Sequence, residues 1–396
     1  MPKDRDLDTQ SSFPSAGQLP NWENFVRLKA HPEWQQTGKK VRIVDLFCGC
    51  GGLSLGATLA GAMVARPVEI ALAADNWDEA LQVYGANFSP DSHKTLHQDL
   101  AALVESPGSV VLSKQGKALA KTLGRVDLLV AGPPCQGNSD LNNASRRDDP
   151  RNQLYTVPVA MALSLKVEFL VVENVPPVVH SSGKVVFDAV SALTLAGYSV
   201  LDFVANAADF GLPQARRRHI LVASRKHNQA ELEQALTFSK PATTASIWSF
   251  ISDLEMEKPA SLGLLSRPTK MSKDNIERIN YLFDNNLFDL PNQLRPACHR
   301  DKVHSYVSMY GRLRKDAPSQ TITSGFGSMG QGRYVHPTQR RMISAHEAAR
   351  IQGFPDYFSF SNVRNITSLR TMIANAVPPG LIALILARLL AKSDSK

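Results

Sequence analysis

A cysteine follows an apolar, strand-like run in the segment VDLLVAGPPCQGNSD, which spans residues 126–140. Pro133 and Pro134 restrict the backbone before Cys135 and remove two N–H donors, so the chain must leave a sheet there. Cys135 would therefore stand at the carboxyl end of a strand, where open α/β sheets bind their ligands. The alternative is a buried structural cysteine, which most free cysteines are. The position predicts a thiol presented for chemistry.

A glutamate ends the next apolar run, VEFLVVEN, which spans residues 167–174. Glu173 and Asn174 close this run, and a Val-Pro-Pro turn follows. A carboxyl group at the end of a buried strand beside the Cys135 strand is partly desolvated, which favours its protonated form and lets it donate a proton. The alternative is a glutamate that caps a turn.

Three consecutive arginines lead into the apolar run HILVAS, residues 219–224. Alternation along a strand sends Arg216 and Arg218 to one face and Arg217 to the other. Two guanidinium groups on one face suit a phosphate, a base carbonyl or a carboxylate. A solvated edge strand would have the same pattern.

A glycine-rich turn follows the first apolar run, VRIVDLF, residues 41–47. The turn contains Gly49, Gly51 and Gly52 and precedes a helix, so its backbone can approach a ligand closely while helix N–H groups point at it. It departs from the G-x-G-x-x-G fingerprint of dinucleotide sites. By itself such a turn is a weak signal.

Three side chains after the following strands fit a nucleoside. Asp75 ends the run IALAAD, where a carboxylate can bind both ribose hydroxyls, and Trp77 can stack on adenine. Asp99 ends a third candidate strand and could accept a hydrogen bond from the adenine amino group. Each acid alone is more often a surface cap or a turn residue. Together, in this order, they favour a nucleoside cofactor.

The elements that position these groups indicate an α/β fold. Continuous Val/Ile/Leu runs alternate with helix-length stretches from Val41 to about residue 225, which is typical of a mostly parallel sheet covered on both faces. We expect four segments: an extension (1–40) that is at least partly without fixed structure, an α/β domain (41–227), a smaller turn-rich domain (228–339), and terminal helices (340–396) that return to the first domain.

The bulk composition limits the function classes. A net charge of +8 suits a polyanionic partner, and residues 292–315 carry six Lys or Arg against one Asp, with tyrosines between them. A solvated charged face is the alternative for that stretch. The four cysteines, among them the pair Cys48 and Cys50, lack zinc-site spacing, so we expect neither a metal nor disulfides. No secretory signal is visible, and the apolar end LIALILARLLA is too short to span a membrane, so a cytoplasmic protein is expected.

Taken together, the blocks resemble those of the DNA (cytosine-5) methyltransferase family. DLFCGCGG, GPPCQG, ENV, QARRR, HEAARIQGFPD and NAVPP occur in the order that the family shows, between about Val41 and Leu390. The resemblance implies a Rossmann-like S-adenosylmethionine-dependent sheet with a smaller, inserted target-recognition domain. It differs from the family pattern at Asn138, where an aromatic residue is usual, and at His346 and Ala374, where Arg and Gly are usual.

The resemblance implies a mechanism on C5 of a cytosine flipped out of duplex DNA. Cys135 would attack C6, Glu173 would hold N3 and the exocyclic amine, and Arg218 would contact O2 while Arg216 braces the site or a phosphate. S-adenosylmethionine, leaving as S-adenosylhomocysteine, would lie against Phe47, Gly49, Gly51, Gly52, Asp75, Trp77, Asp99, Leu100, Pro134, Asn375 and Val377. DNA contacts would come from Gln136, Ser139, Asn174, Gln214, Arg295, Arg312 and Arg314, with base readout between Arg295 and Gly332.

Further expectations concern partners and rivals. The resemblance implies double-stranded DNA as the partner, no membrane, a monomer at the bacterial nucleoid, and a cognate restriction endonuclease that acts separately. A family member acting on tRNA is one rival. A nicotinamide oxidoreductase would leave PPCQ and the arginines unexplained, and a non-catalytic DNA-binding regulator would not need Cys135, Glu173 and Arg218 together.

Overall fold

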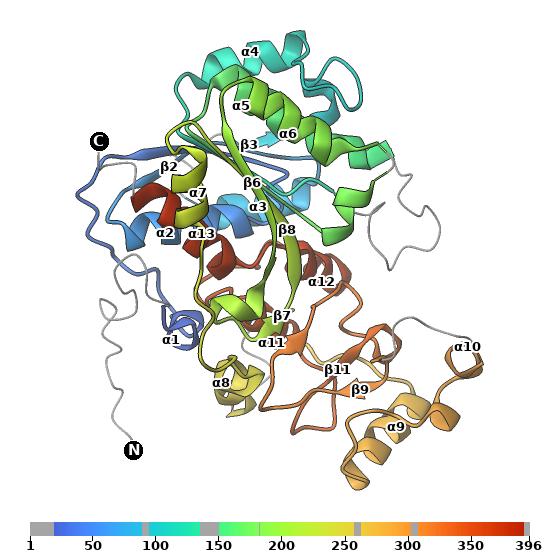
Figure 1. Ribbon diagram of the computed structural model, residues 1–396. Helices are drawn as coiled ribbons and strands as arrows, with labels where there is room; N and C mark the ends of the chain where they lie inside the picture. The colour runs from blue at the N-terminus through green and yellow to red at the C-terminus, as the bar shows by residue number, and fades with distance from the viewer. Residues whose placement is uncertain are drawn as a thin grey trace.

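One central sheet organises the computed structural model, which describes residues 20–88, 95–134, 150–181, 183–256, 263–301 and 308–391 (Figure 1). Within these residues the sheet has seven strands in the order β3-β2-β1-β4-β5-β8-β6. The strands are β1 (Val41–Leu46), β2 (Val68–Asp75), β3 (Thr95–His97), β4 (Leu128–Ala131), β5 (Phe169–Asn174), β6 (Ser199–Asn206) and β8 (Arg217–Ser224).

The sheet corrects two details of the expected topology. Strand β8, the HILVAS run, is antiparallel to both β5 and β6, whereas β1 to β5 pair in parallel. The link from β6 to β8 comprises residues 207–216, too short for the crossover that parallel neighbours need. Strand β6 itself is absent from the sequence-based reading, because polar residues such as Asp202 interrupt its apolar pattern. The antiparallel direction brings the start of β8 to the carboxyl end of β5.

Helices cover both faces of the sheet, as the continuous apolar strands predict. In β1, Val41 and Ile43 join one hydrophobic cluster, and Val44 and Leu46 join the other. On the first face lie α2 (Gly52–Met63), α3 (Asp78–Asn87), α7 (Gln229–Ala235) and α13 (Pro379–Ala391). On the second lie α4 (Lys114–Leu123), α5 (Thr156–Leu165) and α6 (Val185–Leu195), seen at the top of Figure 1.

A second lobe of short elements lies beyond the sheet. It contains α8 (Ile247–Ile251), α9 (Lys273–Asp284), α10 (Ala297–Arg300), β9 (Gly311–Arg312), β10 (Ser319–Gln320) and β11 (Arg333–Val335). Strand β10 pairs with β7 (Gln214–Ala215), and β9 pairs with β11. Helices α11 (Ala345–Ile351) and α12 (Ile366–Asn375) lie between this lobe and the sheet. Short 3-10 turns are η1 (Leu100–Leu103), η2 (Pro150–Tyr155), η3 (Pro176–His180), η4 (Ala207–Phe210), η5 (Ser252–Met256), η6 (Asn292–Leu294) and η7 (Met329–Gln331).

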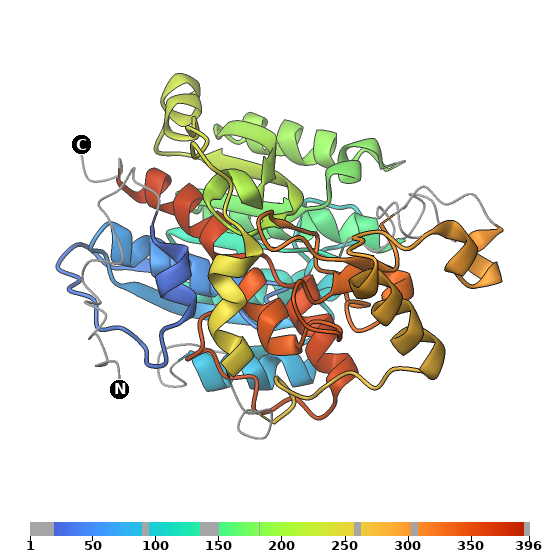
Figure 2. The same cartoon turned by 90° about the horizontal axis from the view of Figure 1, so that it is seen from below.

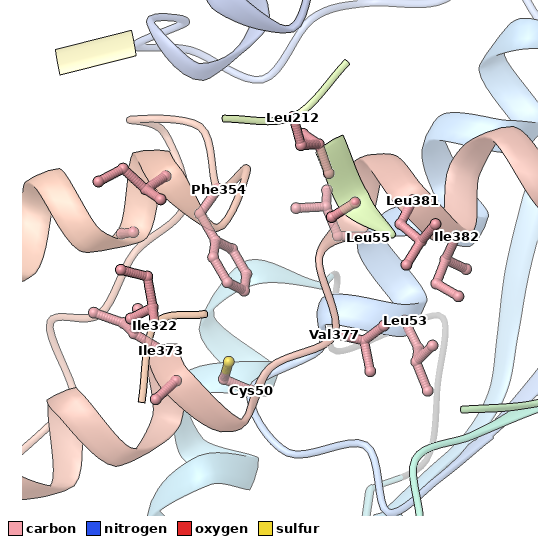
Figure 3. Close-up of a cluster of buried hydrophobic side chains, with 14 of the residues drawn as sticks. Cys50, Leu53, Leu55, Leu212, Ile322, Phe354, Ile373, Val377, Leu381 and Ile382 are labelled. Atoms are coloured by element: carbon pink, nitrogen blue, oxygen red, sulfur yellow. The ribbon is translucent and has the colours of Figure 1, made fainter. Parts of the chain in front are cut away.

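The two lobes share one hydrophobic core (Figure 3). Leu53 and Leu55 from α2 and Leu381 from α13 belong to the same cluster as Ile322, which follows β10, and Phe354, which follows α11. Helix α7, inside the segment expected to form the smaller domain, packs on β6 and α13. Residues from the segments expected as separate domains therefore contribute to one core.

The start of the described part of the N-terminal extension packs on the protein, since Trp22, Phe25, Val26 and Leu28 are buried. Helix α1 (Trp22–Val26) buries Trp22 against Gly380, and the indole Nε1 donates to the carbonyl of Phe210 at 2.9 Å. The chain beyond α1 accepts hydrogen bonds from the backbone of the segment that follows α11. The apolar residues of α1 form a run too short to show helical periodicity, so the sequence did not predict that this helix packs on the protein.

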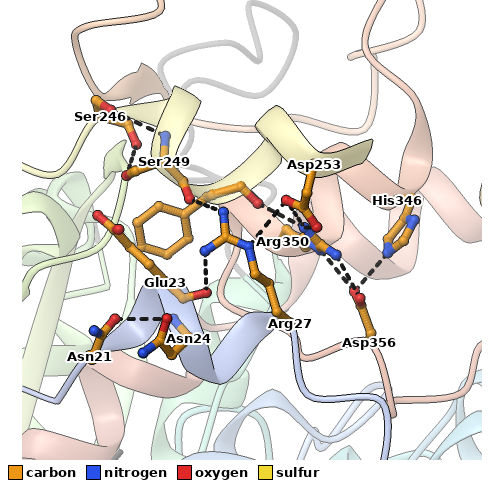
Figure 4. Close-up of polar contacts among 11 residues, drawn as sticks. Asn21, Glu23, Asn24, Arg27, Ser246, Ser249, Asp253, His346, Arg350 and Asp356 are labelled. Carbon is orange, nitrogen blue, oxygen red and sulfur yellow. Dashed lines mark hydrogen bonds and ion pairs between the residues drawn. The ribbon is translucent and has the colours of Figure 1, made fainter. Parts of the chain in front are cut away.

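A charged network ties this extension to both lobes (Figure 4). Arg27 pairs with Asp253 at 3.1 Å, and Arg350 on α11 pairs with the same carboxylate at 2.7 Å. Arg350 also contacts Asp356 at 2.6 Å, which His346 contacts at 2.8 Å. Burial alone would raise the pKa of Asp356, but the hydrogen bonds from His346 and Arg350 outweigh it and lower that pKa to about 2. The network links the C-terminal end of α1, the turn η5 and α11.

We predict that Trp22→Ala destabilises the protein by about 3–5 kcal/mol, because it empties a fully packed indole site and removes a buried hydrogen bond. Urea unfolding followed by circular dichroism measures the change. Trp34→Ala is the control, since Trp34 lies in the same extension but is only partly buried. Equal midpoints for Trp22→Ala and the wild type would show that the extension is dispensable.

The described residues contain one stretch, Ile366–Ala391, that is long and apolar enough to cross a membrane, with a mean hydropathy of 1.8. It comprises α12 and α13, and 83% of its 18-residue apolar window is buried inside the protein. Core helices pass the same test, so this stretch is weak support for a membrane span.

Candidate active site

The carboxyl ends of the parallel strands meet along one edge of the sheet. Asp75 ends β2 beside the turn that follows β1, Gly132 follows β4, and Glu173 lies near the end of β5. An ideal Cβ built on Gly132 would lie 3.9 Å from Oε2 of Glu173 and 3.7 Å from both Leu53 and Val377. The residues expected at the cofactor end and at the reacting end are therefore brought together.

The turn after β1 has a backbone that its glycines make possible. Gly49 and Gly51 have φ of 53° and 103°, in the left-handed region that favours glycine. A Cβ on Gly51 would lie 2.4 Å from the ring of Phe88, and one on Gly52 would lie 2.4 Å from the carbonyl oxygen of Val377. By contrast, apart from Gly49 and its chain neighbours, no described residue has an atom within 4 Å of the corresponding position on Gly49. The turn is packed on one side and open at Gly49.

Asp75 holds this turn in place. Its Oδ2 accepts from the N–H of Gly49 at 2.8 Å, and its Oδ1 accepts from the N–H of Trp77 at 2.9 Å. Burial raises the pKa of Asp75, and these backbone hydrogen bonds act in the opposite direction. Asp99 is exposed and lies beyond the end of β3, where it accepts from the N–H of Ala101 as the cap of η1. Both acids thus have structural partners, and any ligand would share their oxygens.

A second buried acid lies behind the turn, and the sequence reading missed it. Asp45 in β1 is fully buried, and Ser54 donates to its Oδ2 at 2.7 Å. The hydroxyl of Tyr84 lies 2.6 Å from Ser54, and it must donate because Ser54 gives its own proton to Asp45. Burial raises the pKa of Asp45 to about 7. An acid inside the otherwise apolar run VRIVDLF was the available signal.

The reacting end centres on an ion pair between β5 and β8. Nε of Arg218 lies 2.7 Å from Oε1 of Glu173, and the two side chains are 13% and 9% exposed. The N–H bond does not point at that oxygen, so the contact is an ion pair rather than an aligned hydrogen bond. The pair forms because β8 runs antiparallel to β5, with Glu173 opposite Ile220.

Asn174, expected among the DNA contacts, has a structural position. It is buried, and its amide donates to the carbonyl of Pro133 at 3.2 Å while its Oδ1 accepts from the N–H of Val175. This bond joins the end of β5 to the Pro133-Pro134 turn after β4. Cys135, Gln136 and Ser139, which follow that turn, lie outside the described residues.

Arg216 and Arg218 do not act on one shared group, contrary to the alternation argument. Arg216 precedes β8 and donates to the carbonyls of Ile322 at 3.2 Å, Ala374 at 2.9 Å and Ala376 at 3.2 Å. With 2% exposure, it is part of the interior. It therefore joins the loop after β10 to the end of α12.

Gln214 is likewise interior, which corrects its assignment to the DNA contacts. It is fully buried, its Oε1 accepts from the N–H of Ile322 at 3.0 Å, and its Nε2 donates to Oε1 of Gln352 at 2.7 Å. Gln352 in turn donates to the carbonyl of Ile373 at 2.6 Å. Gln214, Arg216 and Gln352 thus hold the second lobe against the segment that contains Val377.

The arginines expected to contact DNA differ in their exposure and in their contacts within the protein. Arg312 lies 3.9 Å from the ring centroid of Phe283, and its Nε and Nη2 both donate to the carbonyl of Pro337. Its half-buried guanidinium is therefore held within the lobe, and its contact with DNA stays a prediction. Arg314 is exposed, with its guanidinium 4.1 Å from the ring of Phe288. Arg295 is half-buried near Tyr310. Figure 2 shows this side of the molecule, with α9 and α10 projecting away from α1.

No group of three or more His, Cys, Asp or Glu side chains suited to a metal ion occurs within the part of the chain that the structure describes.

The chain is similar to known proteins that are named Type II methyltransferases. Type II methyltransferase M1.BsuMI of Bacillus subtilis (strain 168) is 40% identical over 363 residues, covering 92% of this chain and 83% of the relative. Type II methyltransferase M1.HphI of Haemophilus parahaemolyticus is 31% identical over 364 residues, covering 89% and 87%.

Solved structures share the fold. S. pombe Dnmt2 has a TM-score of 0.60 at 18% identity, covering 90% of this chain and 99% of that one. The Entamoeba histolytica methyltransferase EhMeth has a TM-score of 0.59 at 15% identity, covering 91% and 100%. At these identities the likeness shows the fold alone.

The family described as C-5 cytosine-specific DNA methylase matches residues 41–391, which include the glycine turn, Glu173, Arg218 and the Val377 segment. The chain therefore belongs to this family and is a DNA (cytosine-5) methyltransferase.

Proposed function

We propose that this enzyme methylates C5 of a cytosine flipped out of a specific duplex DNA sequence, through a covalent bond between Cys135 and C6. The observation that carries the proposal is the convergence of Glu173, its partner Arg218 and the Val377 segment at the strand end that leads to Cys135. Flipping is required because a neighbouring base covers C6 in a stacked duplex. Unstacking costs a few kcal/mol.

In the proposed mechanism the Cys135 thiolate forms a bond to C6, and the electron pair of the C5–C6 double bond moves to C5. The carboxyl group of Glu173, in its protonated form, donates a hydrogen bond to N3 and accepts one from the exocyclic amine, so its proton offsets the negative charge that develops on the ring. Arg218 contacts O2 and keeps Glu173 oriented. After C5 has gained the methyl group it loses its proton to water, the bond from C6 to sulfur breaks, and the double bond re-forms. Arg216, Asn174 and Gln214 act as positioning residues.

Membership of a methyltransferase family implies S-adenosylmethionine as the methyl donor. When bound, it supplies a methyl group on a sulfonium sulfur and leaves as S-adenosylhomocysteine; we propose no metal. The open space at Gly49 and the half-buried ring of Trp77 fit a nucleoside. We assign to this site Phe47, Gly49, Gly51, Gly52, Asp75, Trp77, Asp99, Leu100, Pro134, Asn375 and Val377.

We predict that Gly52→Ala weakens S-adenosylmethionine binding roughly ten-fold, because a Cβ there meets the backbone of Val377 and forces a shift worth about 1–3 kcal/mol. Isothermal titration calorimetry measures the Kd. Gly85→Ala is the matched control. Gly85 lies in α3, and apart from its chain neighbours and the helix backbone no described residue has an atom within 4 Å of its Cβ position, so alanine should leave the Kd unchanged. Equal Kd values for both variants would show that the close approach of Gly52 and Val377 does not contribute to S-adenosylmethionine binding.

For DNA we assign the segment from Arg295 to Gly332 to base readout, with Arg314 contacting phosphate and Gln136 and Ser139 closing on the flipped base. The 228–339 segment is the proposed recognition domain. The names of the relatives, Type II methyltransferases, support a place in a restriction–modification system beside a separate endonuclease. We propose that the enzyme works as a monomer at the nucleoid in the bacterial cytoplasm, without a membrane partner.

Bisulfite sequencing of DNA from cells that express the protein tests this function and identifies the recognition sequence. We expect protected cytosines at one short motif. In vitro, transfer of a tritiated methyl group to duplex DNA and to tRNA separates the DNA activity from the alternative tRNA activity. Labelling of tRNA alone would overturn the DNA assignment.

A further inference from the structure

Arg370 on α12 is a half-buried cation without an acidic partner among the described residues. Its Nη2 donates to the hydroxyl of Thr269 at 2.7 Å, and its buried Nε has no hydrogen-bond partner within the part of the chain that the structure describes. Burial lowers the pKa of Arg370, yet an arginine stays charged under all working conditions. Holding an uncompensated charge partly away from water is costly, which favours a site that an anion completes.

A glycine loop leaves the space that this guanidinium fills. The loop after β10 reads Thr-Ser-Gly-Phe-Gly-Ser over residues 323–328. An ideal Cβ on Gly327 would lie only 2.1 Å from Cζ of Arg370, so an alanine there must displace the guanidinium. The ring of Phe326 lies 5.7 Å from the same Cζ. Arg370 is therefore held between the loop and Thr269, with a defined position.

This position is connected to the proposed active site through α12 and the segment that follows it. Arg370 precedes Ala374 by one helical turn of α12, about 6 Å along the axis. Arg216 joins the carbonyl of Ala374 to that of Ile322, the residue directly before the glycine loop. Three residues beyond Ala374, Val377 lies near Gly132 and Glu173. A DNA strand that delivers a base to Glu173 would pass within reach of this loop.

We propose that Arg370, seated on Gly327 and oriented by Thr269, is an anchor for a DNA phosphate beside the target cytosine. The proposal rests on the proposed function, since it needs DNA as substrate. An arginine presents a planar fork of donors that matches phosphate oxygens, and a hydrogen bond to a charged group is stronger than a neutral one. Such a contact would fix the register of the flipped nucleotide without reading a base.

The test compares charge, position and packing. Arg370→Gln removes the charge, Arg370→Lys keeps it, and Gly327→Ala keeps the net charge but displaces the guanidinium. Arg388→Gln is the matched control, because Arg388 on α13 also lies 5.7 Å from an aromatic ring, that of Phe238. For each variant, the Kd for a duplex is measured by fluorescence anisotropy at several salt concentrations. The Kd for S-adenosylmethionine and the melting temperature are measured alongside.

We expect Arg370→Gln and Gly327→Ala to weaken duplex binding roughly ten-fold. In Arg370→Gln the slope of log K against log salt should also fall by about 0.9, the value for one phosphate contact. Arg370→Lys should keep the slope, and Arg388→Gln should match the wild type. An unchanged slope and Kd in Arg370→Gln would overturn the proposal, as would a loss confined to S-adenosylmethionine binding. A wild type that labels tRNA but not DNA would instead overturn the proposed function.

Discussion

Replacing Cys135 by serine is expected to lower methyl transfer to DNA by about 10⁴-fold or more, with the affinity for DNA retained. A serine hydroxyl stays protonated near neutral pH, so it cannot add to C6 as a thiolate does. Transfer of a tritiated methyl group measures the rate. A duplex that carries 5-fluorocytosine at the target should trap a denaturation-resistant adduct with the wild type, because fluorine cannot leave C5 as a proton does.

Cys298→Ser is the control for this substitution, because Cys298 is a free, exposed thiol in the second lobe. It should still form the adduct, and any change in rate should follow a change in the Kd for DNA, because Cys298 lies in the segment assigned to base readout. Burial raises the pKa of Cys50 to about 12 and raises that of Cys48 as well, so both thiols stay protonated and are poor nucleophiles. An adduct that persists in Cys135→Ser would contradict the assignment of the nucleophile.

The sequence predicted the parts of the site that depend on one physical rule. Runs of Val, Ile and Leu indicate buried parallel strands, and the carboxyl ends of such strands must share an edge. Asp75, Gly132 and Glu173 each end or follow one of these runs, and the structure places them along that edge. Local pattern and sheet geometry were enough for these residues.

Contacts between distant segments could not be predicted in the same way. The partners of Arg216, at Ile322 and Ala374, lie more than a hundred residues away in the chain, and no periodicity encodes their approach. Trp22 belongs to a single short helix, and no periodic pattern in the sequence indicates its contact with Phe210. The alternation of side chains along a strand also did not place Arg216 on the same face as Arg218, because β8 begins one residue later, at Arg217.

The second large effect is expected for Glu173→Gln, which should reduce the single-turnover rate by about 10²–10⁴-fold. Glutamine has nearly the same shape but loses the charge that faces Arg218 at 2.7 Å, and it leaves that guanidinium without its ion-pair partner. It also cannot hold a base N3 and a developing ring charge as a carboxyl group can. The Kd values for DNA and S-adenosylmethionine should change little, so the loss should fall on kcat rather than on KM.

Glu168→Gln is the matched control for this prediction. Glu168 directly precedes β5, at the opposite end of the strand from Glu173, and it pairs with Arg125 at 3.1 Å. Glu168→Gln therefore removes the same charge beside the same strand, but at the end far from the reacting edge. The single-turnover rate should stay within about two-fold of the wild type, since ion pairs near the surface contribute little. Equal rates in the two variants would mean that the Glu173–Arg218 pair only stabilises the fold. A loss confined to Glu173→Gln, with an unchanged melting temperature, would place the carboxyl group of Glu173 in the chemical step.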